Sequence, residues 1–434
     1  MHHVKPPLLA AALFFLLFTA SDSWSQPGRK IHGNVTDSLT GNPVPFATVT
    51  LRDNLAGTVT NENGDFQLLI PDGVRDDILI ITLLGYRMQQ LTLSTLRDTV
   101  AVRLSPVALE LREVQVRAQP PEYYIRMAMR AIPENYPSSP FETRSYYREI
   151  IRENGNFLRS HEGIFRTYFP NFRDSSKNQH QLMLFRKASD LKELAFMKKE
   201  RMKEEEKNRR DQAKGKIKNK GKDKKNDGRG DSDSLSIGEL FGGPDNLLQL
   251  AGLLRDEGNF LDTNAFRDYH YSFASFNSYN DNSIMVIDFR TKGKVDRVRQ
   301  SGRIYIDIAS NAIVKADYRG EFVIPALLRP VLLVLGIGVK NPKFKSDVSF
   351  SQAKGRWYPA TMLFNLNLEV ERKRLFAAND NSSFIIDGVL TVNQVKITDA
   401  GPVPHDKRYK SSKRPEEQVH NDEGLSWEKV NIIR

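Results

Sequence analysis

The chain has 434 residues, a hydrophobic fraction of 39% and no cysteine. It is long enough for two or three domains with ordinary cores, while a disulfide framework, a cysteine zinc site and a lipid-modified N-terminal cysteine are all excluded. The formal net charge is +11, but residues 198–229 hold 15 Lys and Arg against 7 Asp and Glu, an excess of 8 (15 − 7). Most of the positive net charge therefore comes from this one segment, and the rest of the chain is close to neutral.

The N-terminus has the parts of a secretory signal peptide. Lys5 precedes an apolar run over residues 8–18, and small residues up to Ser25 provide a cleavage point. The run is shorter than the roughly twenty residues that a membrane-spanning helix needs. We predict that residues 1–25 are removed on export and that the mature chain begins at Gln26. An uncleaved membrane anchor is the alternative.

Short runs of strand-forming residues alternate with turn residues over residues 29–118. Phe66, Leu68 and Ile70 recur with a period of two, which places one side of their strand in a core. Gly64 suits the positive φ of a tight turn before that strand. The pattern predicts a β-sandwich of the transthyretin or immunoglobulin type.

Four motifs of this segment match a known family, and they are Gly33-Asn34-Val35-Thr36-Asp37, Gly41-Asn42-Pro43-Val44-Pro45-Phe46-Ala47-Thr48-Val49, Thr58-Val59-Thr60-Asn61-Glu62-Asn63-Gly64-Asp65-Phe66 and Leu84-Gly85-Tyr86. The segment resembles the carboxypeptidase-regulatory-like domain, a transthyretin-like sandwich common in exported proteins of Bacteroidetes. The resemblance implies a cell-envelope setting and a binding or scaffold role, in which the motif residues serve the fold.

A second β-rich domain is predicted over residues 121–397, beginning with a short helix after Pro121. Residues 191–236 interrupt it with a charged tract of low apolar content, which we expect to be a disordered basic insert. Another short helix near Asp245 precedes an antiparallel meander, which favours a curled antiparallel sheet or half-barrel with a few helices. Residues 398–434 follow as a polar, loose C-terminal tail. The chain is therefore predicted to be mainly β.

Several motifs of the second domain also have relatives, and they are Gly242-Gly243-Pro244-Asp245-Asn246, Asn259-Phe260-Leu261-Asp262, Gly302-Arg303-Ile304-Tyr305-Ile306-Asp307 and Gly355-Arg356-Trp357-Tyr358-Pro359. The domain resembles the uncharacterised companion domain that follows the regulatory-like sandwich in many Bacteroidetes envelope proteins. In its strand-turn-strand pattern it is also similar to the open barrels of periplasmic lipoprotein carriers. Neither resemblance implies particular site residues.

The basic insert has two interpretations. Its lysines could contact an anionic glycan, lipopolysaccharide or acidic lipid through long-range, salt-sensitive attraction, or the insert could be a plain solvated loop. Nucleic acid is not expected as a partner, because the lysines lack interleaved aromatic residues for base stacking. The lysines concerned are Lys214, Lys216, Lys218, Lys220, Lys222, Lys224 and Lys225.

The most apolar stretch outside the signal covers residues 325–339 and is too short to cross a membrane. It is either a buried helix or strand, or a lining that contacts a lipid or acyl chain. In the second case the apolar ligand would touch Leu327, Leu328, Val331, Leu332, Val334 and Leu335.

Two patterns invite a catalytic interpretation. His420 and Glu423 have the H-x-x-E spacing of a metallocarboxypeptidase, but the chain ends at Arg434, before a third ligand far downstream. Asp307 and Asp317 could pair across a hairpin, although alternation places them on a solvated face at least as readily. We therefore predict no catalytic, cofactor or metal residues.

The leading hypothesis is a non-enzymatic binding or scaffold protein of the cell envelope that recognises a protein, a glycan or another envelope partner. It would reside in the periplasm or associate peripherally with the outer membrane. The alternative is a periplasmic carrier that shelters a lipid or lipoprotein acyl chain in the concave face of the second domain. A hydrolase such as a metallocarboxypeptidase is the third hypothesis.

Overall fold

The computed structural model describes residues 29–52, 56–71, 73–107, 119–172, 177–188, 243–255, 257–279, 282–293, 298–323, 337–340, 342–372 and 380–433. The predicted signal peptide, the lysines of the basic insert and the proposed apolar lining lie outside these residues. Within the described ranges, no helix combines the length and apolar character that crossing a bilayer would require.

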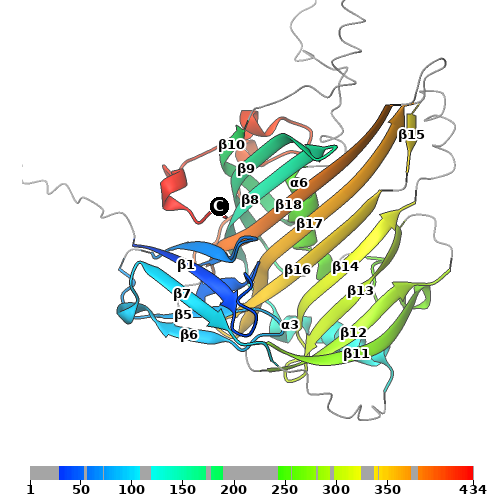
Figure 1. Ribbon diagram of the computed structural model, residues 1–434, viewed down its shortest axis with the longest axis horizontal. Coiled ribbons are helices and arrows are strands. Elements are labelled where there is room, and N and C mark those ends of the chain that lie inside the picture. Colours follow the sequence, from blue (N-terminus) through cyan, green and yellow to red (C-terminus); the bar gives the residue numbers. More distant parts are fainter. Residues whose placement is uncertain are drawn as a thin grey trace, which may run out of the picture.

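The N-terminal domain is a sandwich of two sheets (Figure 1). One sheet has the order β4-β1-β7 and the other β3-β2-β5-β6. The strands are β1 (Lys30–Asp37), β2 (Thr48–Leu51), β3 (Gly57–Val59), β4 (Asp65–Leu69), β5 (Ile78–Thr82), β6 (Gln89–Thr92) and β7 (Thr99–Leu104). The alternating residues Phe66, Leu68 and Ile70 are buried in the core between the sheets, at 5%, 0% and 2% exposure. The predicted sandwich is confirmed.

The second domain is one large antiparallel sheet with the order β10-β9-β8-β18-β17-β16-β14-β13-β12-β11, to which β15 adds beside β17. Its strands are β8 (Phe141–Glu153), β9 (Asn156–Phe169), β10 (Gln179–Ala188), β11 (Tyr269–Tyr279), β12 (Asn282–Thr291), β13 (Val298–Asp307), β14 (Ile313–Phe322), β15 (Ile337–Val339), β16 (Lys343–Ala353), β17 (Arg356–Arg372) and β18 (Asp380–Lys396). The last strand, β18, returns to pair with the first, β8. No bridge joins β10 to β11 in the described part of the chain, so the curled sheet stays open, as predicted.

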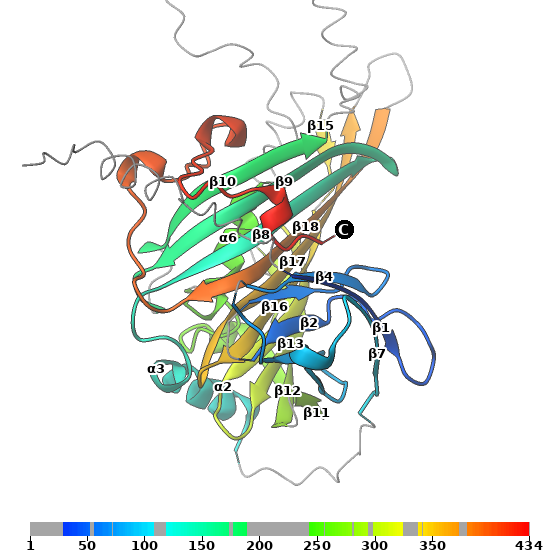
Figure 2. The same ribbon diagram turned by 90° about the vertical axis from the view of Figure 1, so that its left-hand side faces the viewer.

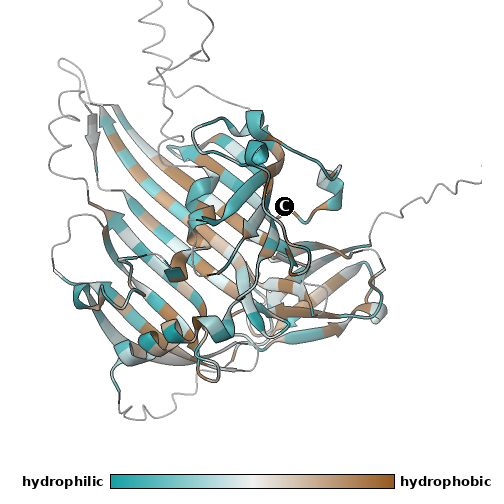
Figure 3. Cartoon of the chain, turned by 180° about the vertical axis from the view of Figure 1, so that it is seen from behind, coloured by the Kyte–Doolittle hydropathy of each residue, from teal (hydrophilic) through white to brown (hydrophobic). Residues whose placement is uncertain are grey.

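The helices α2 (Pro121–Arg130), α3 (Ile132–Asn135) and α6 (Pro244–Leu250) lie on one face of this sheet (Figures 2 and 3). Strand alternation supplies that face with apolar side chains, which join the helices in one continuous core. A Cβ at Gly388 of β18 would come within 2.9 Å of Leu247 on α6, so the glycine permits close packing of the helix.

The opposite face of the sheet carries the sandwich and the C-terminal segment (Figure 2). Val59 of β3 shares a small core with Tyr146 of β8, Val389 of β18 and two residues near the C-terminus, Val430 and Ile433. The second domain and the sandwich therefore share buried side chains on this face. The other members of this core are Ile164 and Met183.

The expectation of a loose C-terminal tail is wrong. Val430 and Ile433 are 3% and 4% exposed, and Asn431 is 6% exposed. The Asn431 side chain accepts a hydrogen bond from the backbone N–H of Leu69 at 2.6 Å and donates one to the carbonyl oxygen of Gly57 at 2.9 Å. Polar composition suggested mobility, but a few apolar residues and one amide attach the segment to both domains.

The expectation that Asp307 is a solvated surface residue is also wrong. Asp307 is 3% exposed, and its carboxylate accepts hydrogen bonds from the backbone N–H and the hydroxyl of Ser310 in the turn between β13 and β14. A short aspartate before a turn bonds to local backbone, which is a structural role.

Candidate functional site

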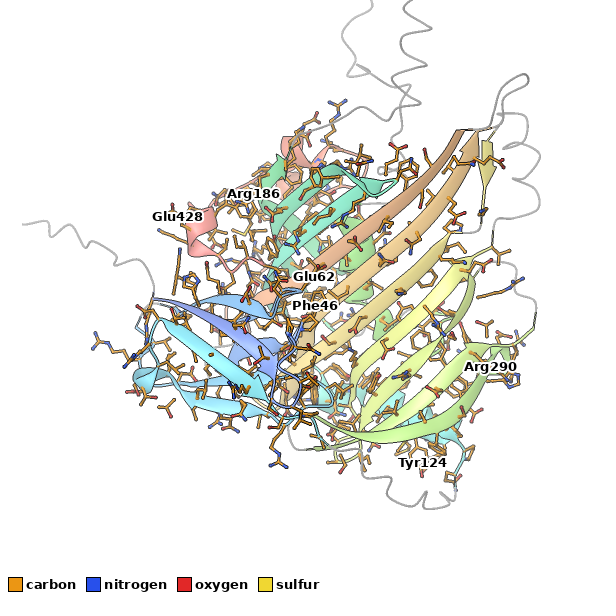
Figure 4. The ribbon with its side chains drawn as sticks, viewed as in Figure 1. Phe46, Glu62, Tyr124, Arg186, Arg290 and Glu428 are labelled. Carbon is orange, nitrogen blue, oxygen red and sulfur yellow. The ribbon has the colours of Figure 1, made fainter. Side chains whose placement is uncertain are left out.

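A groove with a volume of about 1050 Å³ lies on the sheet face that is opposite to the helices. Its floor crosses β11, β12, β13, β14, β16, β17 and β18, and its sides include β8 and two loops of the sandwich. We call it the sheet groove. Three of its lining residues are labelled in Figure 4, with Phe46 and Glu62 of the sandwich at one end of the open sheet face and Arg290 at the other.

Strand register arranges the charged side chains of the floor in two parallel rows. In the first row, Asp288, Arg303, Asp317 and Asp347 follow one another on β12, β13, β14 and β16, and we call it the acidic row. In the second row, two residues away along each strand, the members are Arg290, Ser301, Arg319, Lys345 and Asn365, and we call it the basic row. Both rows point to the same face because side chains alternate with a period of two.

The acidic row is held by neighbouring cations and by a tyrosine. The Nε of Arg303 lies 3.6 Å from Oδ1 of Asp288, and the Nζ of Lys315 lies 2.5 Å from Oδ2 of Asp347. Burial raises the pKa of the Asp347 carboxyl, the charge on Lys315 opposes this, and the nearby Asp317 adds to the rise. Burial also raises the pKa of Tyr305, and its hydrogen bond to Asp317 acts in the same direction.

The basic row is different, because its cations have no ion-pair or hydrogen-bond partner among the described residues. Arg319 and Lys345 stand directly opposite each other on β14 and β16, and Arg290 lies one strand beyond Ser301. A second hollow of about 520 Å³ continues the groove over this row. Its lining includes five cationic side chains and a single carboxylate, namely Arg290, Arg299, Arg319, Lys343, Lys345 and Glu321.

The sandwich supplies one wall of the groove. Phe46 has a left-handed backbone with φ of 58°, and its N–H donates to the carbonyl oxygen of Thr60 at 3.0 Å. A bulky residue in this conformation is strained, and such strain is retained where the surrounding structure imposes it. Glu62 lies in the turn before β4, whose shape depends on Gly64 with φ of 77°.

The wall beside β8 is closed by ion pairs and by the C-terminal segment. Arg152 Nη1 lies 2.5 Å from Oδ2 of Asp387, and the amide nitrogen of Asn365 donates to Oδ1 of the same carboxylate at 2.6 Å. Arg148 Nη1 donates to the carbonyl oxygen of Ile433 at 3.0 Å. These contacts fix the polar side chains at this end of the groove.

The sequence alone did not identify the groove residues. Phe46 and Glu62 belong to motifs that we assigned to the fold, yet both side chains line the groove. The sequence offers Asp307 as a partner of Asp317, but the neighbours of Asp317 across the sheet are Arg303 and Asp347. The alternation of charged residues along β12, β13, β14 and β16 is a signal that could have indicated a charged sheet face. The register that aligns these strands with one another is not visible in the sequence.

The histidine and acid of the C-terminal H-x-x-E pattern lie outside the groove. Glu423 forms an ion pair with Arg144, while Asp422, which lies between the two, bonds to Lys407 Nζ at 2.9 Å and to Gln181 Nε2 at 3.2 Å. No group of three residues suited to hold a metal ion occurs in the described ranges.

The helix-covered face offers the carrier hypothesis no support in the described part of the chain. Its apolar side chains pack into the core with α6, where Tyr136 stacks on Phe172 and Phe350 meets both rings edge to face. The groove lies on the other face, and charged and polar residues outnumber apolar ones in its lining, although apolar atoms make up about half of its surface. The apolar stretch on which the carrier depended is described only at residues 337–339, as β15.

Comparison with known families places a CarboxypepD_reg-like domain at residues 31–116. This span covers the strands of the sandwich and supports the resemblance that its motifs indicated. No curated protein matches the chain.

Two solved structures are similar in part. One is a DUF1329 family protein from Desulfovibrio piger, with 11% identity, coverage of 65% of this chain and 95% of the other, and a TM-score of 0.23. The other is a protein of unknown function from Bacteroides fragilis for which membrane association is suggested, with 11% identity, coverage of 85% and 98%, and a TM-score of 0.14. Scores this low do not establish a shared fold.

Proposed function

We propose that this chain, whose N-terminal sandwich is a CarboxypepD_reg-like domain, is a non-enzymatic binding protein of the cell envelope that holds a polar ligand in the sheet groove. The observation that carries the proposal is the groove of about 1050 Å³ between the sandwich and the open sheet face. Its volume is in the upper range for small-molecule sites and suits a ligand of several units.

The arrangement of the groove favours recognition over turnover. The carboxylates of the acidic row are engaged by fixed neighbours, Asp288 by Arg303 and Asp347 by Lys315. The Lys315–Asp347 pair is largely buried and presents a fixed pattern of charge to a ligand, whereas the Asp288–Arg303 pair is half-exposed. Side chains that are fixed before binding lose little entropy on binding. The envelope setting is supported by the predicted signal peptide and by the sandwich domain, and the basic insert is a further proposed contact for anionic envelope material.

The absence of cysteine allows a direct test, because one introduced thiol is a unique attachment point. Ser301→Cys places the thiol on the groove floor, and Leu39→Cys places it on the sandwich, where Leu39 is 81% exposed. Each variant is labelled with a bulky polyethylene glycol maleimide. Binding of maltohexaose, oligogalacturonate and oligoglutamate is then measured by isothermal titration calorimetry.

We expect at least one probe to bind the unlabelled protein saturably, to lose its affinity when position 301 is labelled, and to keep it when position 39 is labelled. The bound probe should be recovered with unchanged mass after prolonged incubation. Equal affinity in both labelled variants, or no binding of any probe, would contradict the groove as the site. Cleavage of the probe would contradict the non-enzymatic role.

A further inference from the structure

We infer that the basic row is a subsite for the acid groups of an anionic saccharide. The inference rests on the proposed function and specifies the class of ligand. Carboxylate, sulfate and phosphate groups on sugars share the chemistry that this row would recognise, which is a fixed series of anions accompanied by hydroxyl groups.

The basic row carries positive charge that no described residue compensates. Arg319 and Lys345 face each other directly, and like charges in this position destabilise a sheet. Neither has an ion-pair or hydrogen-bond partner among the described residues, whereas Arg303 of the acidic row and Lys315 beside it are both paired. An anion placed between the two would remove the repulsion and gain charge-assisted hydrogen bonds.

The cations of the basic row are regularly spaced across the sheet. Adjacent strands are about 4.8 Å apart, so Arg319 and Lys345 are one spacing apart, and Arg290 is two spacings, or roughly 10 Å, from Arg319. Three cations in a line match a ligand chain that carries acid groups at intervals better than they match a single small anion. Ser301 and Asn365 lie in the same row and offer hydrogen bonds to hydroxyl groups.

The pairing of the strands under the basic row favours a saccharide over an acidic peptide. Extended peptides commonly bind by adding a strand to an exposed sheet edge, where main-chain hydrogen bonds are available. The strands under the basic row, which are β12, β13, β14, β16 and β17, are paired on both sides and present only side chains to the groove. A ligand recognised through acid groups and hydroxyl groups fits this surface better than one recognised through its backbone.

The test uses the full mature chain and three probes of similar length. Oligogalacturonate supplies an acidic saccharide, maltohexaose a neutral one, and oligoglutamate an acidic peptide. The affinity for each probe is measured for the wild type, for Arg319→Gln and for Lys345→Gln. Arg103→Gln is the matched control, because Arg103 lies on β7 of the sandwich, exposed and away from the groove.

Oligogalacturonate should bind, and R319Q and K345Q should each weaken it roughly tenfold or more, the value of a charge-assisted hydrogen bond. R103Q should leave the affinity unchanged, and added salt should weaken binding to the wild type more than binding to either R319Q or K345Q. Thermal unfolding verifies folding, and neither glutamine variant should be less stable, since each removes a repulsive pair.

Three results would overturn the inference. If maltohexaose binds as tightly as oligogalacturonate and the glutamine variants change neither, the groove binds saccharides but the basic row is not an anion subsite, and the proposed function stands. If oligoglutamate binds more tightly and is lost in the same variants, the ligand is an acidic peptide. If no probe binds, both the inference and the proposed function fail.

Discussion

The attachment of the sandwich to the sheet depends on Asn431, and Asn431→Ala should weaken it measurably. The substitution removes two hydrogen bonds and leaves the N–H of Leu69 and the carbonyl of Gly57 without these partners. Each buried polar group without a partner costs about 1–3 kcal/mol, so the two together should lower the free energy of unfolding by about 2–6 kcal/mol. The backbone of Asn431 also accepts a bond from Asn393 at 2.6 Å, which the variant retains.

Urea denaturation measures the decrease in the free energy of unfolding, and amide hydrogen exchange shows which strands are destabilised. Exchange should accelerate first at β3 and β4, where Gly57 and Leu69 lie. The matched control is Asn421→Ala, because Asn421 is exposed and its side chain bonds only locally, to the backbone of Leu425 at 2.7 and 2.8 Å. If N431A were as stable as N421A, the C-terminal segment would not hold the two domains together.

Three further predictions concern the turn, the histidines and the N-terminus. In thermal unfolding, Gly64→Ala should lower the stability by at least about 2 kcal/mol more than Gly155→Ala does. A Cβ at Gly64 would lie 2.3 Å from the carbonyl oxygen of Val35, whereas a Cβ at Gly155 would meet open space. Equal losses of stability in the two variants would refute this. Burial lowers the pKa of His180 to about 4, below its unfolded value near 6.5, so the folded state binds fewer protons and loses stability as pH falls from about 6.5 to about 4. His180→Gln should reduce this loss in pH-dependent denaturation, whereas the exposed His405→Gln should not. N-terminal sequencing of the exported protein should begin at Gln26, and a retained Met1 would contradict signal cleavage.

Local patterns in the sequence predict the strands well. Phe66, Leu68 and Ile70 alternate, and all three are buried, because a half-buried strand needs one apolar side. The turn at Gly64 and the glycine-rich motifs likewise follow from backbone geometry that can be recognised one segment at a time.

The groove could not be predicted in the same way, because it depends on register between distant strands. Asp317 and Asp347 become neighbours only when β14 pairs with β16, and β8 meets β18 across more than half of the chain. The docking of Val430 and Ile433 against both domains is equally non-local. Composition described that segment as a loose polar tail, although two buried apolar side chains are enough to attach it.

The most direct test of the sheet groove as the ligand site is hydroxyl-radical footprinting of side chains, with and without saturating oligogalacturonate. Phe46 and Leu363 line the groove, and Phe157 is 42% exposed on β9, outside it. Bound ligand should reduce the oxidation of Phe46 and Leu363 and leave that of Phe157 unchanged. Unchanged oxidation at Phe46 and Leu363 under saturating ligand would show that the ligand binds elsewhere.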